Sequence, residues 1–202
     1  MSVTPQILIT TGRSRLWVIP NYTQDIYPYL QPVFTYEEPP IVVFGKQGKQ
    51  HRDVSFYSDE SRGYAYSGQF MPSLPLANAP IIQQLLPAVN KSLGTNFNGV
   101  LVNRYRDGTK YLSAHADDER GLDRHNKTVA GLAYGATRIF QITNKKTGEV
   151  IANIPHHSGM LIVMDGEFQK QFKHSIPIVP GKKADKLAVG ERISVTFRYH
   201  TE

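Results

Sequence analysis

The stretch Arg192–Arg198, RISVTFR, alternates polar and apolar residues along its whole length. As a β-strand, it places Arg192, Ser194, Thr196 and Arg198 on one face and its apolar side chains on the other. In an ordinary sandwich, such a polar face is turned to water. In a barrel with an internal site, it would line a dicarboxylate pocket, because an arginine fork can grip a carboxylate with paired N–H groups. The stretch predicts a β-rich fold and leaves the surroundings of its polar face open.

Similar short runs fill the chain from Asn98 onward. They are GVLVNRY (99–105), TRIFQIT (137–143) and GMLIVMD (159–165), and NKKTG (144–148) is typical of a hairpin loop. Many short strands at this spacing predict a sandwich or barrel. One helix is expected over Pro80–Leu93, because Pro80 suits a first turn and Gly94 a stop, although Pro87 lies inside it. The outline is α+β with a jelly-roll centre.

Length and composition predict one soluble globular domain over residues 1–202, with 40% hydrophobic and 20% charged residues. No apolar run is long enough for a membrane span, so we expect no membrane contact. The N-terminal segment lacks a charged region followed by a continuous apolar stretch, so we expect no signal peptide. We therefore expect an intracellular monomer, in the cytoplasm or, in a eukaryote, the nucleus.

Cysteine content and charge restrict the chemistry further. The chain has no cysteine, which excludes disulfides, thiolate nucleophiles and iron–sulfur ligation and leaves His, Asp and Glu to hold any metal. The formal net charge is +6. A basic surface suits a polyanionic partner such as nucleic acid, but solubility alone is an equally good explanation.

Residues 41–72 combine aromatic and charged side chains and do not resemble core sequence. The residues that give this character are Phe44, Phe56, Tyr57, Tyr64, Tyr66 and Phe70, with Lys46, Lys49, His51 and Arg52.

His115 and Asp117 lie two positions apart in the segment SAHAD (113–117). On a strand, the two side chains project from the same face, roughly 6.6 Å apart at the backbone. Such a pair, with one more histidine, could hold an iron(II) ion that keeps open positions. In a chain with 7 histidines and 17 acidic residues, however, His-x-acid pairs arise by chance. Taken alone, a surface histidine beside a solvated aspartate is the simpler interpretation.

Several motifs occur together in the order of one known family. They are VFGK (43–46), YAYSG (64–68), NRYRDG (103–108), HADDE (115–119), YGA (134–136), KHS (173–175) and RISVTFR (192–198). From about Val42 to Tyr199, the sequence thereby resembles the AlkB family of nucleic-acid demethylases, most of all its animal members that repair double-stranded DNA. The resemblance implies a double-stranded β-helix (jelly-roll) core over 96–202, with flanking helices and an N-terminal nucleotide-recognition lid over 41–72.

The resemblance also implies a metal and a cosubstrate. His115, Asp117 and His174 would hold Fe(II), and the rival histidines His156 and His157 lie beside Pro155 and Ser158, where a loop is expected. The residues that would bind 2-oxoglutarate are Asn103, Tyr105, Arg192, Thr196 and Arg198. For Tyr105, a buried hydroxyl with an ordinary hydrogen bond is the alternative. With O2, the family forms an iron(IV)-oxo species that oxidises an N-methyl group and releases formaldehyde and succinate.

The implied partner is DNA, with RNA left open, presenting a flipped methylated base such as 1-methyladenine or 3-methylcytosine. Tyr64 and Tyr66 would lie near that base, where the family has Phe in place of Tyr66. Phe44 would be a wedge inserted into the duplex, although a buried lid residue is the simpler interpretation. The other implied substrate-binding residues are Arg52, Ser67, Asp118 and Glu119. Candidate phosphate contacts, although each is more often a plain solvated side chain, are Lys46, Lys49, Arg106, Lys110, Lys182 and Lys183.

Two other functions fit parts of the sequence. A 2-oxoglutarate oxygenase acting on RNA modifications, proteins or small molecules would share the metal motif but would not need the aromatic lid. A catalytically silent jelly-roll that only binds nucleic acid would not need intact metal and arginine residues.

Overall fold

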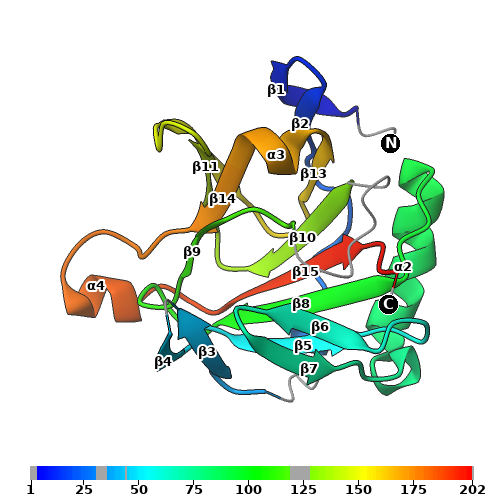
Figure 1. Cartoon of the computed structure of the whole chain (residues 1–202), viewed down its shortest axis with the longest axis horizontal. Coiled ribbons are helices and arrows are strands. Elements are labelled where there is room, and N and C mark those ends of the chain that lie inside the picture. Colours follow the sequence, from blue (N-terminus) through cyan, green and yellow to red (C-terminus); the bar gives the residue numbers. More distant parts are fainter. Residues whose placement is uncertain (1–3, 31–35, 44, 119–127, 202) are drawn as a thin grey trace.

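The computed structural model describes residues 4–30, 36–43, 45–118 and 128–201. A large and a small antiparallel sheet form the centre of the fold (Figure 1). Residues of both sheets line an inner cavity. This arrangement, with few helices, confirms the predicted jelly-roll core with flanking helices.

The large sheet has the strand order β1-β2-β13-β10-β15-β8-β5, with every neighbouring pair antiparallel. Its strands are β1 (Gln6–Thr11), β2 (Ser14–Ile19), β13 (Leu161–Gly166), β10 (Val129–Gly135), β15 (Arg192–Arg198), β8 (Gly99–Tyr105) and β5 (Asp53–Tyr57). The small sheet has the order β12-β11-β14-β9. Its strands are β12 (Val150–His156), β11 (Arg138–Asn144), β14 (Phe172–Ile176) and β9 (Leu112–His115).

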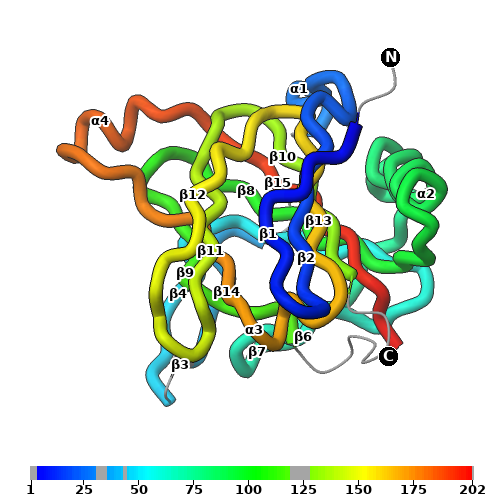
Figure 2. Tube along the Cα trace, turned by 90° about the horizontal axis from the view of Figure 1, so that it is seen from above, coloured from blue at the N-terminus to red at the C-terminus, as the bar shows by residue number. Residues whose placement is uncertain are grey.

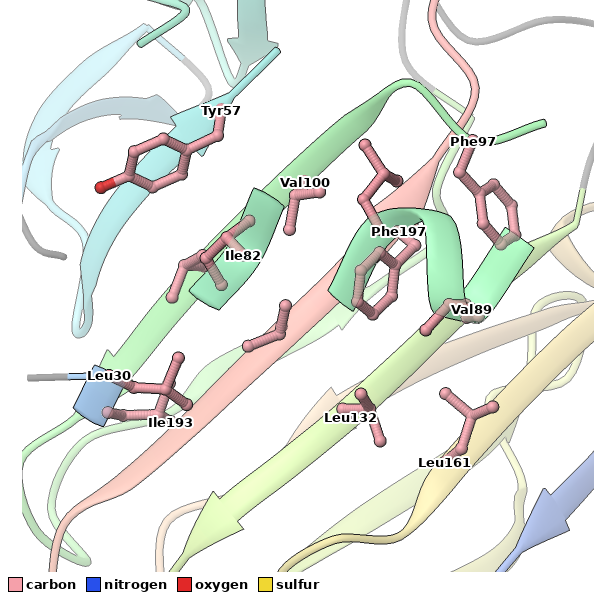
Figure 3. Packing of buried hydrophobic residues seen from close by; sticks show 14 of the residues in the cluster. Leu30, Tyr57, Ile82, Val89, Phe97, Val100, Leu132, Leu161, Ile193 and Phe197 are labelled. Atoms are coloured by element: carbon pink, nitrogen blue, oxygen red, sulfur yellow. The ribbon is translucent and has the colours of Figure 1, made fainter. Parts of the chain in front are cut away.

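Helix α2 (Pro80–Leu93) covers the outer face of the large sheet and matches the predicted bounds. It ends at Gly94, whose φ of 64° is the left-handed conformation that glycine adopts without strain. Figure 3 shows Ile82 and Val89 of α2 packed over Val100 and Phe197 of the sheet. This packing forms the main hydrophobic core.

The two faces of β15 differ in the way that its alternation predicted. Ile193, Val195 and Phe197 are fully buried in the core beneath α2. The polar side chains of the opposite face, from Arg192 to Arg198, line the inner cavity between the sheets. The polar face of this strand is therefore turned to an internal site and away from bulk water.

Two hairpins lie beside the large sheet at the lower side of Figure 1. The first pairs β3 (Pro40–Val43) with β4 (Lys46–Lys49), and the second pairs β6 (Gly63–Tyr66) with β7 (Gln69–Pro72). The β6–β7 turn contains Ser67 and Gly68, which both have positive φ, as a two-residue hairpin turn of type I′ requires. The Val42 N–H donates to the Ser67 carbonyl at 3.1 Å and joins the two hairpins.

The expectation that residues 41–72 lie outside the core is wrong for β5. All residues of Asp53–Tyr57 are buried, because β5 pairs with β8 along the edge of the large sheet. Val54 and Phe56 pack with Tyr64 and Leu101 in a separate apolar cluster. The aromatic residues of this region therefore serve both the core and the hairpins.

The N-terminal residues, which no motif explained, add the β1–β2 hairpin to the large sheet (Figure 2). The remaining short helices are α1 (Tyr27–Leu30), the 3₁₀ helix η2 (Leu76–Asn78), α3 (Phe168–Gln171) and α4 (Lys183–Leu187). Helix α4 projects at the opposite side of the molecule from α2 in Figure 2. Within the described ranges, no helix is long and apolar enough to cross a membrane.

Candidate metal and cosubstrate site

His115, Asp117 and His174 converge at one end of the inner cavity. Each offers one ligand atom, and these atoms all lie within 4.8 Å of one another. His115 and His174 are directly paired across β9 and β14. Asp117 Oδ1 lies 3.3 Å from His115 Nε2, and Asp117 Oδ2 lies 3.8 Å from His174 Nε2. This group of three is the one metal-type cluster that the described part of the chain contains.

Local structure differs from the regular strand expected for His115 and Asp117. Strand β9 ends at His115, and Asp117 follows in a bend. The buried Gln169 of α3 fixes this bend, because its Oε1 accepts from the Asp117 backbone N–H at 2.9 Å. His115 Nδ1 lies 3.0 Å from the Ser113 carbonyl. Since a carbonyl can only accept, Nδ1 carries the proton and Nε2 offers its lone pair to the site.

Asp117 is ionised and His174 is neutral in this environment. Burial alone would raise the pKa of Asp117, but the positive charge of Arg198 holds that pKa well below its usual value. Arg198 Nη2 donates to Asp117 Oδ1 at 2.8 Å. Burial lowers the pKa of His174 to about 3, so its imidazole keeps a lone pair at neutral pH. The ring stacks on Phe140, with centroids 5.2 Å apart.

The inner cavity extends from His115 and His174 along the polar face of β15. Arg192 lies at the far end of β15 and is 1% exposed. Among the described residues, no carboxylate pairs with its guanidinium, and its Nε and Nη1 have no hydrogen-bond partner. Burial lowers the pKa of Arg192 to about 10. A buried guanidinium in this state favours an anionic ligand.

Neighbouring strands complete the cavity wall. Tyr105 lies opposite Arg192 on β8, and the guanidinium carbon is 5.4 Å from its ring centroid. Asn103 is also buried in this wall, and its Oδ1 has no partner among the described residues. Thr196 and Ser194 line the same cavity. Facing Thr196, Gly131 of β10 leaves open space, since a Cβ there would have no atom within 4 Å.

A second depression, here named the outer cleft, also borders His115. It is lined by residues of the two hairpins, of the segment between β4 and β5, and of β9, including Gln50, Arg52, Tyr66, Ser67 and Ser113. The rings of Tyr66 and His115 are nearly perpendicular, with centroids 6.1 Å apart, and the Arg52 guanidinium lies 5.1 Å from the Tyr66 ring centroid. His115 thus borders both the inner cavity and the outer cleft.

Comparison with known proteins decides the family. A model described as "2OG-Fe(II) oxygenase superfamily" matches residues 21–198, nearly the whole chain. The chain belongs to the 2OG-Fe(II) oxygenase superfamily. Within this superfamily, similarity to relatives also supports the resemblance to the AlkB family.

The relatives carry names of that family. The chain is 31% identical over 166 residues to the mouse protein "DNA oxidative demethylase ALKBH2", a match that covers 78% of this chain and 65% of the mouse protein. It is 29% identical to the human protein of the same name, covering 78% of this chain and 60% of that protein. It is 28% identical to human "Alpha-ketoglutarate-dependent dioxygenase alkB homolog 3", over 90% and 60% of the two chains. The chain thus spans less than two thirds of the length of these relatives.

A solved structure supports the fold. The structure of OsALKBH1 matches 96% of this chain and 100% of its own, with a TM-score of 0.59 and 14% identity.

Oxygenases of this superfamily use iron(II), 2-oxoglutarate and O2, and the residues here fit the first two. Two neutral imidazoles and a carboxylate are a donor set for iron(II) that leaves positions open. Asp117 Oδ2 is buried without a hydrogen-bond partner among the described residues, as a ligand atom would be. The Arg192 guanidinium, buried without an anion, fits the distal carboxylate of 2-oxoglutarate.

The structure places the predicted substrate residues of this oxygenase in different surroundings. Tyr66 and Ser67 line the outer cleft, whereas Tyr64 is 1% exposed and lines the inner cavity behind Tyr66, parallel to its ring. Arg52 borders both spaces. Asp118 points to the exterior beside Tyr66 and Ser67, where the Lys145 ammonium donates to it at 2.7 Å. Phe44 and Glu119 lie outside the described residues.

Two of the candidate phosphate contacts are already used in ion pairs. Arg106 binds the buried Asp53 at 2.8 Å and Glu37 at 2.9 Å, and Lys110 pairs with Glu38. Lys46, Lys49, Lys182 and Lys183 are exposed. These four exposed lysines therefore remain available to contact a phosphate backbone.

Sequence reasoning was wrong about the surroundings of His156, which ends β12 and does not lie in a loop. Its ring is 2% exposed in the inner cavity and contacts Arg192, away from the three converging ligands. The alternation of β12 could have placed it, because Ala152, Ile154 and His156 share the inward face. Gly131 also carried a signal, since a glycine inside a strand often marks the close approach of a ligand. No local pattern pointed to Gln169.

Proposed function

We propose that this chain is an iron(II)- and 2-oxoglutarate-dependent dioxygenase that removes N-methyl groups from bases of DNA. Lesions such as 1-methyladenine and 3-methylcytosine are the proposed substrates. The observation that carries the proposal is the place of His115, whose side chain borders both the inner cavity and the outer cleft. A metal held there would face a cosubstrate on one side and a base on the other.

The inner cavity supports the cosubstrate part of the proposal. Arg192 would bind one carboxylate of 2-oxoglutarate at the buried end, with Asn103 and Tyr105 beside it. Arg198 lies at the metal end, where it donates to Asp117, and would orient the other end of the cosubstrate. Because the apolar back of β15 is fully buried beneath α2, both arginines are attached to a rigid strand.

The outer cleft supports the part of the proposal that concerns the methylated base. A methylated base inside a duplex has to be flipped out before it can reach His115. Tyr66 lines this cleft, and stacking of a base on an aromatic ring is worth roughly 1–3 kcal/mol per base. The exposed Asp118 carboxylate lies along the same edge and would favour a cationic methylated base and accept from its amine. The formal charge of +6 adds a general attraction to phosphates.

The chemistry divides between the bound groups and the protein. When bound, iron(II) with 2-oxoglutarate and O2 supplies the oxidation of the N-methyl carbon, and the hydroxymethylated base then releases formaldehyde. The protein's part is to hold the ligands in fixed orientation. His115 donates through Nδ1 to Ser113 and so presents Nε2, while Gln169 fixes the bend that carries Asp117. Both cosubstrate arginines are buried away from bulk water, Arg192 at the far end and Arg198 at the metal end.

The test is a panel of oligonucleotides that carry 1-methyladenine or 3-methylcytosine in single- and double-stranded DNA and in RNA. After incubation with iron(II), 2-oxoglutarate and ascorbate, mass spectrometry should show loss of one methyl group, with formaldehyde and succinate formed in equal amounts. Asp117→Asn is the inactive control. If succinate forms but every oligonucleotide keeps its methyl group, the oxygenase acts on another class of substrate. If neither succinate nor formaldehyde forms, the enzymatic proposal is wrong.

A further inference from the structure

His156 lies in the inner cavity beside Arg192 and has no part in the metal group. Its ring is 2% exposed at the end of β12. His156 Nε2 lies 3.0 Å from the Met160 carbonyl, and His156 Nδ1 lies 3.0 Å from Arg192 Nη2. Both ring nitrogens therefore have a partner, one from the backbone and one from the arginine.

These two contacts define the proton positions. A carbonyl oxygen can only accept, so His156 Nε2 carries the hydrogen and donates to Met160. Nδ1 then has a free lone pair, and Arg192, which can only donate, gives it one N–H of Nη2. Burial, followed by the nearby Arg192 charge, lowers the pKa of His156 to about 3, so the ring stays neutral and keeps this acceptor at neutral pH.

The contact restricts an otherwise mobile side chain. Arginine has several rotatable bonds, and their freedom is lost when a ligand binds. Here the Tyr105 ring lies against the guanidinium, and His156 fixes the rotation of its plane. The Nε and Nη1 groups remain without partners among the described residues. They are the donors that a carboxylate entering the cavity can use.

We propose that His156 is a positioning residue, which holds Arg192 in the orientation that receives the distal carboxylate of 2-oxoglutarate. This inference rests on the proposed function. A consequence is that His156, which belongs neither to the metal group nor to the outer cleft, controls the preference for a dicarboxylate ligand over a monocarboxylate of the same chain length.

The test compares two 2-oxo acids by calorimetry on the protein loaded with Mn(II), which binds in place of iron without supporting turnover. 2-Oxoglutarate has the distal carboxylate, and 2-oxopentanoate has the same chain length without it. His156→Leu should weaken 2-oxoglutarate binding about tenfold or more, the usual effect of losing a hydrogen bond to a charged group. Binding of 2-oxopentanoate should not change. His156→Gln, which can accept and donate at similar positions, should stay within about threefold of wild type for both ligands.

Two further variants separate positioning from general structural damage. The exposed neighbour His157, whose Nδ1 contacts Thr137 at 3.1 Å, provides the matched control His157→Leu, which should bind both ligands as the wild type does. In an Arg192→Gln background, His156→Leu should cause no further loss, because the two residues act through one contact. If His156→Leu does not fold, His156→Asn replaces it, since the shorter amide cannot reach both Met160 and Arg192.

The outcomes are distinct. Equal weakening of both 2-oxo acids by His156→Leu, or unchanged binding of 2-oxoglutarate, overturns the positioning role while the proposed function stands. Additive losses in the Arg192→Gln background overturn it as well. A wild-type protein that binds Mn(II) but shows no preference for 2-oxoglutarate overturns the proposed function, and the inference with it.

Discussion

Replacing Asp117 with Asn tests the metal centre with little change of shape. Asp117 is the only carboxylate of the converging group, its side chain is fully buried, and its Oδ1 accepts from Arg198 at 2.8 Å. Asparagine keeps a carbonyl oxygen for Arg198 but removes the negative charge. Two neutral imidazoles remain, which is a much weaker site for iron(II) or Mn(II). We expect the variant to fold and to lose both metal binding and turnover.

The size of the effect follows from linkage. A ligand present at 100 times its Kd stabilises the folded protein by about 2.7 kcal/mol. For a chain of this length, each kcal/mol raises the Tm by roughly 2–4 °C. Adding Mn(II) to metal-free wild type should therefore raise the Tm by roughly 5–11 °C. In Asp117→Asn the rise should be close to zero.

The result of Asp117→Ala would be harder to interpret than that of Asp117→Asn. It removes the buried carboxylate partner of the Arg198 guanidinium, and breaking a buried ion pair costs about 3–5 kcal/mol. Lost activity could then reflect unfolding. Asp118→Asn is the matched control, because Asp118 is exposed, pairs with Lys145 and should leave the Mn(II) response intact. The reasoning is refuted if Asp117→Asn, measured by scanning calorimetry and the demethylation assay, keeps the wild-type Mn(II) shift or turnover.

Three further predictions concern the outer cleft, the buried His156 and two glycines. Tyr66→Ala should lower kcat/KM on methylated oligonucleotides roughly tenfold or more through lost stacking, whereas Tyr66→Phe should not. Because burial lowers the pKa of His156 from 6.5 to about 3, stability should fall by about 1.4 kcal/mol per pH unit as pH drops below 6.5. Urea unfolding of the metal-free protein at pH 7 and pH 5 should show a smaller fall for His156→Gln. Gly166→Ala should lower the free energy of unfolding, measured in urea, by roughly 3 kcal/mol, because a Cβ there would lie 1.8 Å from the Arg13 carbonyl oxygen. Gly148→Ala should lower it by only about 1 kcal/mol, because a Cβ there would meet nothing within 4 Å.

Elements with a strong period were predictable from sequence. The alternation of Arg192–Arg198 placed every residue of β15 on its observed face. Pro80 and Gly94 gave the bounds of α2, and Pro87 did not break it. Such patterns predict an element correctly because the apolar residues that form its buried face recur at a fixed spacing within one short segment. The pairing of His115 with Asp117 was likewise expected, although a bend, and not a strand, carries the aspartate.

Features that depend on distant contacts were not predictable. Strand β5 was missed because its alternating Val54 and Phe56 lie among aromatic and charged residues that suggested a surface segment. Gln169 acts through a hydrogen bond to a backbone N–H that is 52 positions away. Whether Tyr64 faces the inner cavity or the outer cleft depends on how the β6–β7 hairpin packs against Phe56. Such relations between distant elements have no local signature.

The site joins the two sheets, and this has a consequence for stability. His115 and His174 belong to the small sheet, whereas Arg192 and Arg198 belong to the large one. Without ligands, the Asp117–Arg198 ion pair connects the metal end to the large sheet, and the Arg192–His156 hydrogen bond connects the sheets at the far end. A bound metal with a dicarboxylate would add contacts between both ends of the cavity. A ligand that contacts both sheets binds only when the sheets are packed together. Its binding free energy should therefore oppose the separation of the sheets, which would open the core.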